Sequence, residues 1–593
     1  MTRAFSLTPS LRTLGRTFGR ALGALALCVA AACGPSAGDI DPEGATLQID
    51  PPVSEHMVLN GVAARQTFTA TLVGRDGRKR DVTSEAAFTI DPGIGSFVGN
   101  ELSLGAAGKT LAYAVWEDKT GTAQVISRVK TTRVEPPLDP SVPDLFSRPE
   151  DPARAPAIAY PPDGTVVPRN LGDFETHWTD PHGNDVFEVS LRTEFADVRV
   201  YVAGNNGVAA AGPRPSWQSF AAAEWISAVG LESAVQYQVR AVSTANPTYV
   251  GTTTPRLLKL SNEPMNGGMY YWAASDAGGG AYGIFRHDMA KPGQPAEEFM
   301  TTNQTSGRCV ACHALSRDGT KMAITYDGGN RNGTLIDVAS STRQPDFTTW
   351  NFASFTPDGT RLLTVYDGTI VVRSSADQSV VATMPAAGRA THPDVSADGT
   401  KLVYVRIPAG SDWSFTSGQI YTRSFDPATN AFGPETPLVT DGANNFYPSW
   451  SPDGKWVLFN RSDTNAYNSL NASLWVVKAD GSAPPIQLSA FNQAADGLTN
   501  SWGRWAPFAQ TVGTNQEPIF WITVSSKRDF GVRRVNSVDA EAAKTPQIWM
   551  APFYTERADA GRDPTTPAFR LPFQNLTSNN HIAQWTERVV ITL

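Results

Sequence analysis

The stretch Trp450-Ser-Pro-Asp-Gly454 decides the fold, because related copies of it recur upstream. The other copies are Leu315-Ser-Arg-Asp-Gly319, Phe355-Thr-Pro-Asp-Gly359 and Val395-Ser-Ala-Asp-Gly399, and the four Asp residues are 40, 40 and 55 positions apart. This spacing is typical of a four-stranded structural repeat, with one insertion. Each Asp-Gly pair predicts a hairpin turn, since Gly adopts positive φ and Asp accepts hydrogen bonds within the turn.

A second marker counts the repeats independently. Short apolar pairs, expected to be third strands, lie at Ile284-Phe285, Leu335-Ile336, Ile370-Val371, Ile420-Tyr421, Leu474-Trp475 and Ile548-Trp549. In the sixth repeat the Asp-Gly motif is lost, and the stretches 505–508 and 519–523 take its place. The sequence therefore predicts an all-β chain that ends in a six-bladed β-propeller over residues 263–593.

The first repeat, which begins near Met269, has no strand before it. The C-terminal stretch Asn579-Asn-His-Ile-Ala-Gln-Trp585 matches Asn444-Asn-Phe-Tyr-Pro-Ser-Trp450, which leads into an innermost strand. We expect the C-terminus to complete the first blade, because a closed ring leaves no open strand edges. With their Ser-Pro-Asp-Gly signature the repeats resemble TolB-like (WD-like) propellers, and this resemblance implies a fold but no particular activity.

The run Cys309-Val310-Ala311-Cys312-His313 carries the chemistry. C-x-x-C-H is the spacing at which c-type haem is attached, with two thiols for the vinyl groups and the imidazole as proximal iron ligand. Random placement of 4 Cys and 7 His in 593 residues gives roughly 0.0003 such runs, so chance is a poor explanation. A disulfide or redox Cys pair stays open as an alternative. Zinc would need a second ligand pair, and none lies nearby.

The repeat register suggests where the haem would sit. It places Cys312 level with His392 and Tyr447, in loops that lead into the innermost strands at one mouth of the propeller channel. His581 belongs to the same ring, in the adjacent blade, and is our first candidate for the distal ligand. His392 comes second and Met384, whose Met-Pro context resembles that of small cytochromes, comes third; an open sixth position is the remaining alternative.

The N-terminus predicts export. Four arginines precede the apolar run 21–32, which is too short to span a bilayer and is typical of a signal peptide over residues 1–32. Ala30-Ala31-Ala32-Cys33-Gly34 resembles a bacterial lipoprotein cleavage site, and the resemblance implies a lipid on Cys33 and an outer-membrane address. Plain cleavage after the small residues is the alternative. Residues 33–44 form a flexible tether.

The positions of the cysteines agree with the predicted export. Of the 4 cysteines, Cys28 leaves with the signal peptide and Cys33 takes the lipid, so only Cys309 and Cys312 remain in the mature fold. The only disulfide open to the mature chain joins these two. Because c-type haem is attached outside the cytoplasm, the compartment and the motif are consistent.

Two small β-domains are expected before the propeller. Residues 45–133 alternate in short strands and resemble a bacterial Ig-like (group 2) domain, and residues 156–262 resemble a fibronectin type III or Ig-like domain. Between them, the Pro-rich stretch 134–155 predicts a semi-rigid extended linker without packing of its own. In the second domain, we interpret His177 and His182 as solvated loop residues.

Composition excludes several functions. The net charge of −8 and the absence of a basic run argue against nucleic-acid binding. No G-x-S-x-G, H-E-x-x-H or phosphate-loop motif occurs, so an electron-transfer or binding protein is favoured over a hydrolase. The leading hypothesis is an exported, lipid-anchored haem c protein that acts in electron transfer or redox sensing with a redox or surface protein partner. The alternative is a haem-free cell-surface scaffold that binds a protein or a glycan.

Overall fold

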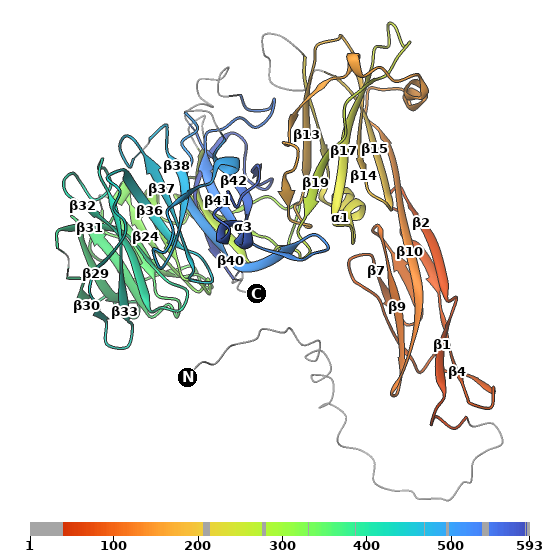
Figure 1. The fold of residues 1–593 in the computed structure, drawn as a ribbon, viewed down its shortest axis with the longest axis horizontal. Helices are drawn as coiled ribbons and strands as arrows, with labels where there is room; N and C mark the ends of the chain where they lie inside the picture. The colour runs from red at the N-terminus through yellow and green to blue at the C-terminus, as the bar shows by residue number, and fades with distance from the viewer. Residues whose placement is uncertain are drawn as a thin grey trace, which may run out of the picture.

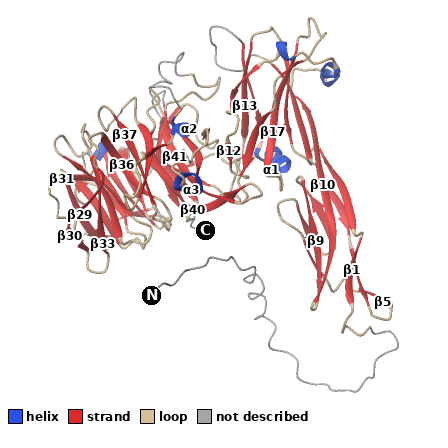
Figure 2. Cartoon of the chain, viewed as in Figure 1, coloured by secondary structure: helices blue, strands red, loops and turns tan. Residues whose placement is uncertain are grey.

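The computed structural model is all-β, with a propeller beside an elongated pair of sandwich domains (Figures 1 and 2). It describes residues 40–204, 214–275, 280–329, 331–385, 387–467, 469–493, 497–535, 545–587 and 589. The predicted signal peptide, Cys33 and the start of the tether lie outside these residues. Among the helices that it does describe, none is long and apolar enough to cross a membrane.

Six sheets form the propeller, as predicted. We number the blades one to six and give the strands of each from the innermost outward. Blade one contains β44 (Ser578–Thr586), β20 (Gly268–Ser275), β21 (Gly283–Asp288) and β22 (Glu297–Thr301); blade two contains β23 (Val310–Leu315), β24 (Lys321–Tyr326), β25 (Thr334–Asp337) and β26 (Thr342–Arg343); and blade three contains β27 (Phe352–Phe355), β28 (Arg361–Tyr366), β29 (Thr369–Ser374) and β30 (Val380–Thr383). Blade four contains β31 (Arg389–Val395), β32 (Lys401–Ile407) and β33 (Gln419–Asp426) with β34 (Ala431–Phe432) and β35 (Thr436–Val439); blade five contains β36 (Asn444–Trp450), β37 (Trp456–Ser462), β38 (Ser473–Lys478) and β39 (Ile486–Gln487); and blade six contains β40 (Ser501–Val512), β41 (Glu517–Ser526), β42 (Gln547–Tyr554) and β43 (Phe569–Arg570). Each of the six apolar pairs from the sequence lies in a third strand.

The Asp-Gly turns have the predicted conformation. Gly319, Gly359, Gly399 and Gly454 have φ of 74°, 66°, 74° and 68°, in the left-handed region that glycine adopts without strain. In one of these turns Asp398 accepts hydrogen bonds from the Ser396 hydroxyl and the Thr400 amide. The turns therefore fix the register between the two inner strands of four blades.

The C-terminal strand closes the ring. β44 pairs antiparallel with β20, from Gly268 opposite Thr586 to Ser275 opposite Ser578, and so supplies the innermost strand of blade one. Arg317 of blade two forms an ion pair with Glu587, at 2.6 Å, directly after β44. The predicted closure is confirmed, and blade one is built from segments about 300 residues apart.

The first sandwich domain contains ten strands and lies at the end of the molecule away from the propeller (Figure 1). They are β1 (Thr46–Asp50), β2 (Val53–Leu59), β3 (Ala64–Thr67), β4 (Thr69–Val73), β5 (Lys79–Asp81), β6 (Ala87–Thr89), β7 (Gly95–Val98), β8 (Glu101–Leu104), β9 (Gly108–Trp116) and β10 (Lys119–Val134). The sheet that contains β10 continues into the second domain, where β10 pairs parallel with β15 over 129–134. The two domains thus share one sheet.

The second domain adds the strands β11 to β19 and one helix. They are β11 (Ala157–Tyr160), β12 (Val166–Val167), β13 (Phe174–Asp180), β14 (Val186–Arg192), β15 (Ala196–Ala203), β16 (Arg214–Phe220), α1 (Ala222–Val229), β17 (Ala234–Val242), β18 (Gly251–Thr252) and β19 (Arg256–Leu260). The only other α-helices in the described residues are α2 (Ser489–Asn492) and α3 (Thr555–Asp559), both in the propeller.

The Pro-rich segment 134–155 is not the free linker that we predicted. It forms two 3-10 helices, Val142–Ser147 and Pro152–Arg154, and buries Val142 and Phe146 against Tyr201 and Val242 of the second domain. The Phe146 carbonyl accepts a hydrogen bond of 2.7 Å from Arg240. Proline restricts the backbone but does not prevent packing, and the apolar residues between the prolines provide the contact.

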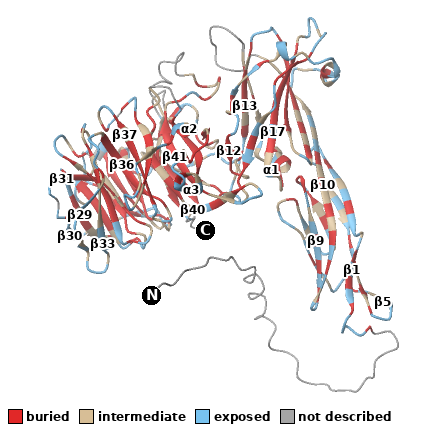
Figure 3. Ribbon diagram, in the orientation of Figure 1, coloured by how far each residue is buried: buried red, intermediate tan, exposed pale blue. Residues whose placement is uncertain are grey.

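The second domain packs against blade six of the propeller, and this contact corrects the interpretation of one histidine. His177 lies in β13 and is fully buried; its ring packs edge-on against Phe530 at 4.6 Å, and its Nδ1 accepts a hydrogen bond from the Val532 amide. Glu175 holds Nε2 at 2.9 Å. His182, in contrast, is an exposed loop residue as predicted. Figure 3 shows buried residues along the strands of the second domain and along those of the propeller.

Candidate functional site

The C-x-x-C-H motif lies at the inner edge of blade two. Cys309 immediately precedes β23, whereas Cys312 and His313 are inside this strand. The equivalent residues His392 and Tyr447 are inside β31 and β36. The prediction that these positions lie in loops is therefore wrong: they lie where the pairing with the second strand shifts register, at bulges in the innermost strands.

The same position recurs in all six blades and lines the channel. It lies at a bulge in five of them, whereas β27 of blade three pairs with β28 without a shift in register. The six residues at this level are Ile582, Cys312, Phe352, His392, Tyr447 and Trp502, and all of them line one small cavity. Four of them, His392, Tyr447, Trp502 and Ile582, have φ between 48° and 58°. This left-handed conformation is strained for residues other than glycine, and here the bulge turns each side chain toward the axis.

Aromatic side chains fill the channel at this level. Tyr447 stacks on Trp502 at 3.9 Å, and His392 lies 4.4 Å from Tyr447 and 4.2 Å, edge-on, from Phe352. The cavity left beside Cys312 is about 30 Å³. We name this cluster of Phe352, His392, Tyr447 and Trp502 the aromatic plug. It closes the channel mouth that the sequence placed next to the motif.

Both thiols of the motif are free and half-buried. Burial raises the pKa of Cys312 to about 11, and burial together with the carboxylate of Asp327 raises the pKa of Cys309. Both sulfurs are therefore protonated at neutral pH. A reactive redox Cys pair needs a lowered thiol pKa, so this environment argues against disulfide-exchange chemistry.

His313 is buried at 6% exposure, and neither Nδ1 nor Nε2 has a hydrogen-bond partner among the described residues. Burial lowers the pKa of His313 to about 4, so the imidazole is neutral with a free lone pair. A buried imidazole without partners is costly, and such groups in native proteins call for an explanation.

The structure brings His581 close to the motif. His581 lies in β44, and its ring packs against Trp272 at 4.8 Å; the indole of Trp272 donates a hydrogen bond of 2.7 Å to the Val310 carbonyl inside the motif. Burial, with a smaller contribution from His313, lowers the pKa of His581 to about 3. Trp272 thus links the ring of His581, in blade one, to the backbone of the motif in blade two.

The other two candidate ligands lie in different surroundings. His392 accepts a hydrogen bond of 3.3 Å from the Tyr447 amide through Nδ1, while its buried Nε2 has no partner among the described residues. Met384 packs in the apolar core that Leu363, Ile370 and Leu402 form between blades three and four. Phe352 of the aromatic plug packs against the same core, and Met384 does not line the cavity beside Cys312.

The donors of the motif suit haem c, but the space beside them does not. Sites for small molecules have volumes of roughly 300–1,000 Å³, whereas the cavity at Cys312 is about 30 Å³. Cys312 and His313 both line this cavity, and Cys312 also packs beside Trp350 and Leu362. Across the described ranges, no group of three or more His, Cys, Asp or Glu side chains is arranged to hold a metal ion.

Sequence reasoning missed Arg504, which lies across the channel. It lines both the cavity at the aromatic plug and a second one, of about 150 Å³, toward the Asp-Gly turns. Burial lowers its pKa, an effect that Asp394 opposes. Phe352 and Trp502 were also missed, although the spacing that aligned Cys312 with His392 would have found Phe352, six residues before Asp358.

Comparisons with known proteins find similarity only among solved structures. No protein-family model matches the sequence, and no curated protein matches it. Among solved structures, TolB from Acinetobacter baumannii is 14% identical, with a TM-score of 0.36 over 59% of this chain and 79% of that one. A protein described as TolB from Agrobacterium tumefaciens is also 14% identical, with a TM-score of 0.29 over 54% and 99%.

An auxiliary nutrient binding protein from Bacteroides thetaiotaomicron is 10% identical, with a TM-score of 0.29 over 68% of this chain and 99% of that one. Similarity at this level carries no information about activity. The sheet topology itself shows that the C-terminal part of the chain is a six-bladed β-propeller.

Proposed function

We propose that this chain is an exported, lipid-anchored c-type haem protein that acts in electron transfer or redox sensing at the cell envelope. Cys309 and Cys312 would hold the haem covalently, and His313 would be its proximal ligand. The lipid on Cys33 would attach the protein to the outer membrane, and the partner would be a redox or surface protein. When bound, the group would supply a one-electron iron centre.

The state of His313 carries the proposal. This residue is buried, neutral and without hydrogen-bond partners among the described residues, directly after two free thiols. A bond from iron to one ring nitrogen would remove the cost of the unpartnered imidazole. Because the cavity is about 30 Å³, holding a porphyrin requires the aromatic plug to open. His581 remains the first candidate for a distal ligand.

Haem attachment is tested by producing the full chain together with a cytochrome c maturation system. We expect a Soret band that stays with the protein through acid-acetone extraction, because thioether bonds survive it. His313→Ala should abolish or strongly reduce this band, since the motif is incomplete. His182→Ala, which changes an exposed histidine elsewhere, is the matched control and should leave the band unchanged. A protein without a Soret band under these conditions would contradict the proposal.

The same spectra test the distal ligand. If His581 binds the iron, His581→Ala should convert a low-spin ferric spectrum to high-spin while the covalent attachment survives. A spectrum identical to that of the wild type would remove His581 and leave His392, Met384 or an open position.

The membrane anchor makes a separate prediction. Cys33→Ser removes the acceptor of the lipid, so the protein should move from the membrane fraction to the soluble fraction of the envelope. Fractionation with immunodetection measures this, and Cys28→Ser is the control, because Cys28 would leave with the signal peptide. Membrane association that survives in Cys33→Ser would show that the lipid is not the anchor.

The second candidate is a haem-free surface scaffold. The closed aromatic plug favours it, because Tyr447 and Trp502 occupy the space where a bound group would be expected. The maturation experiment separates the two candidates. The scaffold predicts no Soret band and a stable protein whose Cys309 and Cys312 can be replaced by serine without loss of folding.

A further inference from the structure

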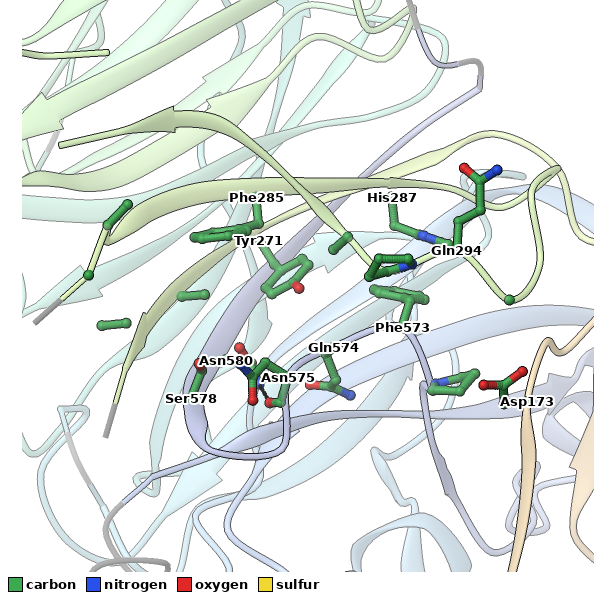
Figure 4. Close-up of a pocket in the computed structure, with 18 of the residues that line it drawn as sticks. Asp173, Tyr271, Phe285, His287, Gln294, Phe573, Gln574, Asn575, Ser578 and Asn580 are labelled. Carbon is green, nitrogen blue, oxygen red and sulfur yellow. Dashed lines mark hydrogen bonds between the residues drawn. The ribbon is translucent and has the colours of Figure 1, made fainter. Parts of the chain in front are cut away.

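A second cavity lies away from the channel, on the flank of blade one (Figure 4). Its volume is about 590 Å³, within the roughly 300–1,000 Å³ that is usual for small-molecule sites. β20 and β21 form one wall, the segment 572–578 before β44 forms another, and Leu171 and Asp173 of the second domain also line the cavity. None of its lining residues also lines the aromatic-plug cavity.

The walls are aromatic. His287 stacks flat on Phe573, with ring centroids 4.0 Å apart and an angle of 12° between the planes. Tyr271 lies 6.0 Å from Phe573 and 6.3 Å from Phe285. Aromatic faces of this kind can pack against the apolar C–H face of a ring-shaped ligand.

Unused polar groups lie among these aromatic faces. Tyr271 is only 2% exposed, its hydroxyl makes no hydrogen bond to a described residue, and Figure 4 shows this hydroxyl pointing into the open space. His287 is 6% exposed and its ring nitrogens likewise have no described partner. The Oδ1 atom of buried Asn580 is also unpartnered among the described residues. Buried polar groups are normally paired, so these atoms are suited to bind a ligand.

The lining is almost free of charge. Among the lining residues only Asp173 carries a full charge; it is exposed at the rim, and its Oδ1 accepts a hydrogen bond of 2.9 Å from the Ala222 amide. His287 is neutral at physiological pH, because burial lowers its pKa to about 4. No Lys or Arg is present to pair with a phosphate or carboxylate, which would be costly to desolvate here.

We propose that this cavity binds a neutral, hydroxyl-bearing ring, namely a sugar unit. Tyr271, His287 and Asn580 would hydrogen-bond its hydroxyl groups, and the face of its ring would pack on Phe573 or Phe285. The rim at Asp173 and Gln294 is exposed, so the unit can belong to a free sugar or to the end of a longer glycan. This inference is independent of haem.

Saturation-transfer NMR on the full-length protein tests the proposal. The probes are the methyl glycosides of glucose, galactose and N-acetylglucosamine, with the matching trisaccharides to distinguish a free sugar from a glycan end. Glucuronic acid is the charged comparison, and indole is the apolar one. We expect transfer to at least one neutral glycoside and little or none to glucuronic acid or indole.

Two variants locate the site. Ala281→Trp fills the cavity and should abolish the transfer, while Tyr271→Phe removes only the hydroxyl and should weaken binding about tenfold. Ala290→Trp is the matched control, since Ala290 is exposed and does not line the cavity. Transfer to none of the neutral glycosides, transfer to indole alone, equal transfer to glucuronic acid, or transfer that survives Ala281→Trp would each overturn the proposal.

Discussion

A chain that ends at Asn575 is expected to lose the cooperative fold of the whole propeller. The truncation removes β44, the innermost strand of blade one, and exposes the edge of β20. It also removes Ile582 from the channel and the buried Trp585. Because each blade packs on its two neighbours in the ring, the damage is not confined to blade one. We expect a loss comparable with the whole stability of a domain, about 5–15 kcal/mol.

Thermal unfolding followed by circular dichroism measures this effect. A chain ending at Glu587 is the matched control, because it keeps β44 and the ion pair with Arg317. Trp585→Ala, with the ring still closed, should be intermediate and cost about 3–5 kcal/mol. If the chain that ends at Asn575 melts at the same temperature as the full chain, β44 does not close the ring in solution.

Acid should destabilise the protein through its buried histidines, and His287 permits a quantitative test. Burial lowers its pKa in the folded state to about 4, an effect that Asp288 and Glu297 partly oppose, from an ordinary value of 6.5. The unfolded chain therefore binds the extra proton first. The stabilisation is complete above pH 6.5 and is lost as the pH falls toward 4. From pH 7.5 to 5, His287 alone should lower the free energy of unfolding by about 2 kcal/mol.

Denaturant unfolding at the two pH values measures the loss. His287→Phe keeps a flat ring against Phe573 but cannot bind a proton, so its stability should fall by about 2 kcal/mol less than that of the wild type over this interval. Burial also lowers the pKa values of His177 and His392, which keeps the same sign of pH dependence in the variant. The same slope in both proteins would mean that His287 is accessible to protons in the folded state.

The propeller could be predicted because its signals are local and repeated. The turn at Gly399 requires positive φ, and the Asp-Gly pair within the four-residue motif Ser396-Ala-Asp-Gly399 is enough to predict it. The partner of β20 could also be found, although it lies about 300 residues away, because β44 retains the Asn-Asn and Trp of another blade. Because the blades repeat, a strand pairing between distant segments can be found by comparing one short stretch of sequence with another.

Other features depend on contacts that sequence spacing does not encode. His177 resembles any polar residue of an alternating strand, and only the surface formed by Phe530 and Val532, about 350 residues later, buries it. The aromatic plug is a similar case. The alignment of the repeats placed Cys312 and His392 at the same level of the propeller channel. How far the side chains of the plug extend across the propeller axis depends on backbone φ at the bulges, which the alignment does not give.

The strand β10 has a mechanical consequence. Its 16 residues pass from the first sandwich domain into the second, so there is no hinge between the two domains in the main chain at this point. The second domain in turn contacts the propeller through Asn262, whose side-chain amide donates hydrogen bonds to the Thr511 hydroxyl and the Gly513 carbonyl. A force applied at the start of the first domain would therefore be transmitted through β10 and the second domain to blade six, and the propeller would keep a fixed distance and orientation relative to the first domain.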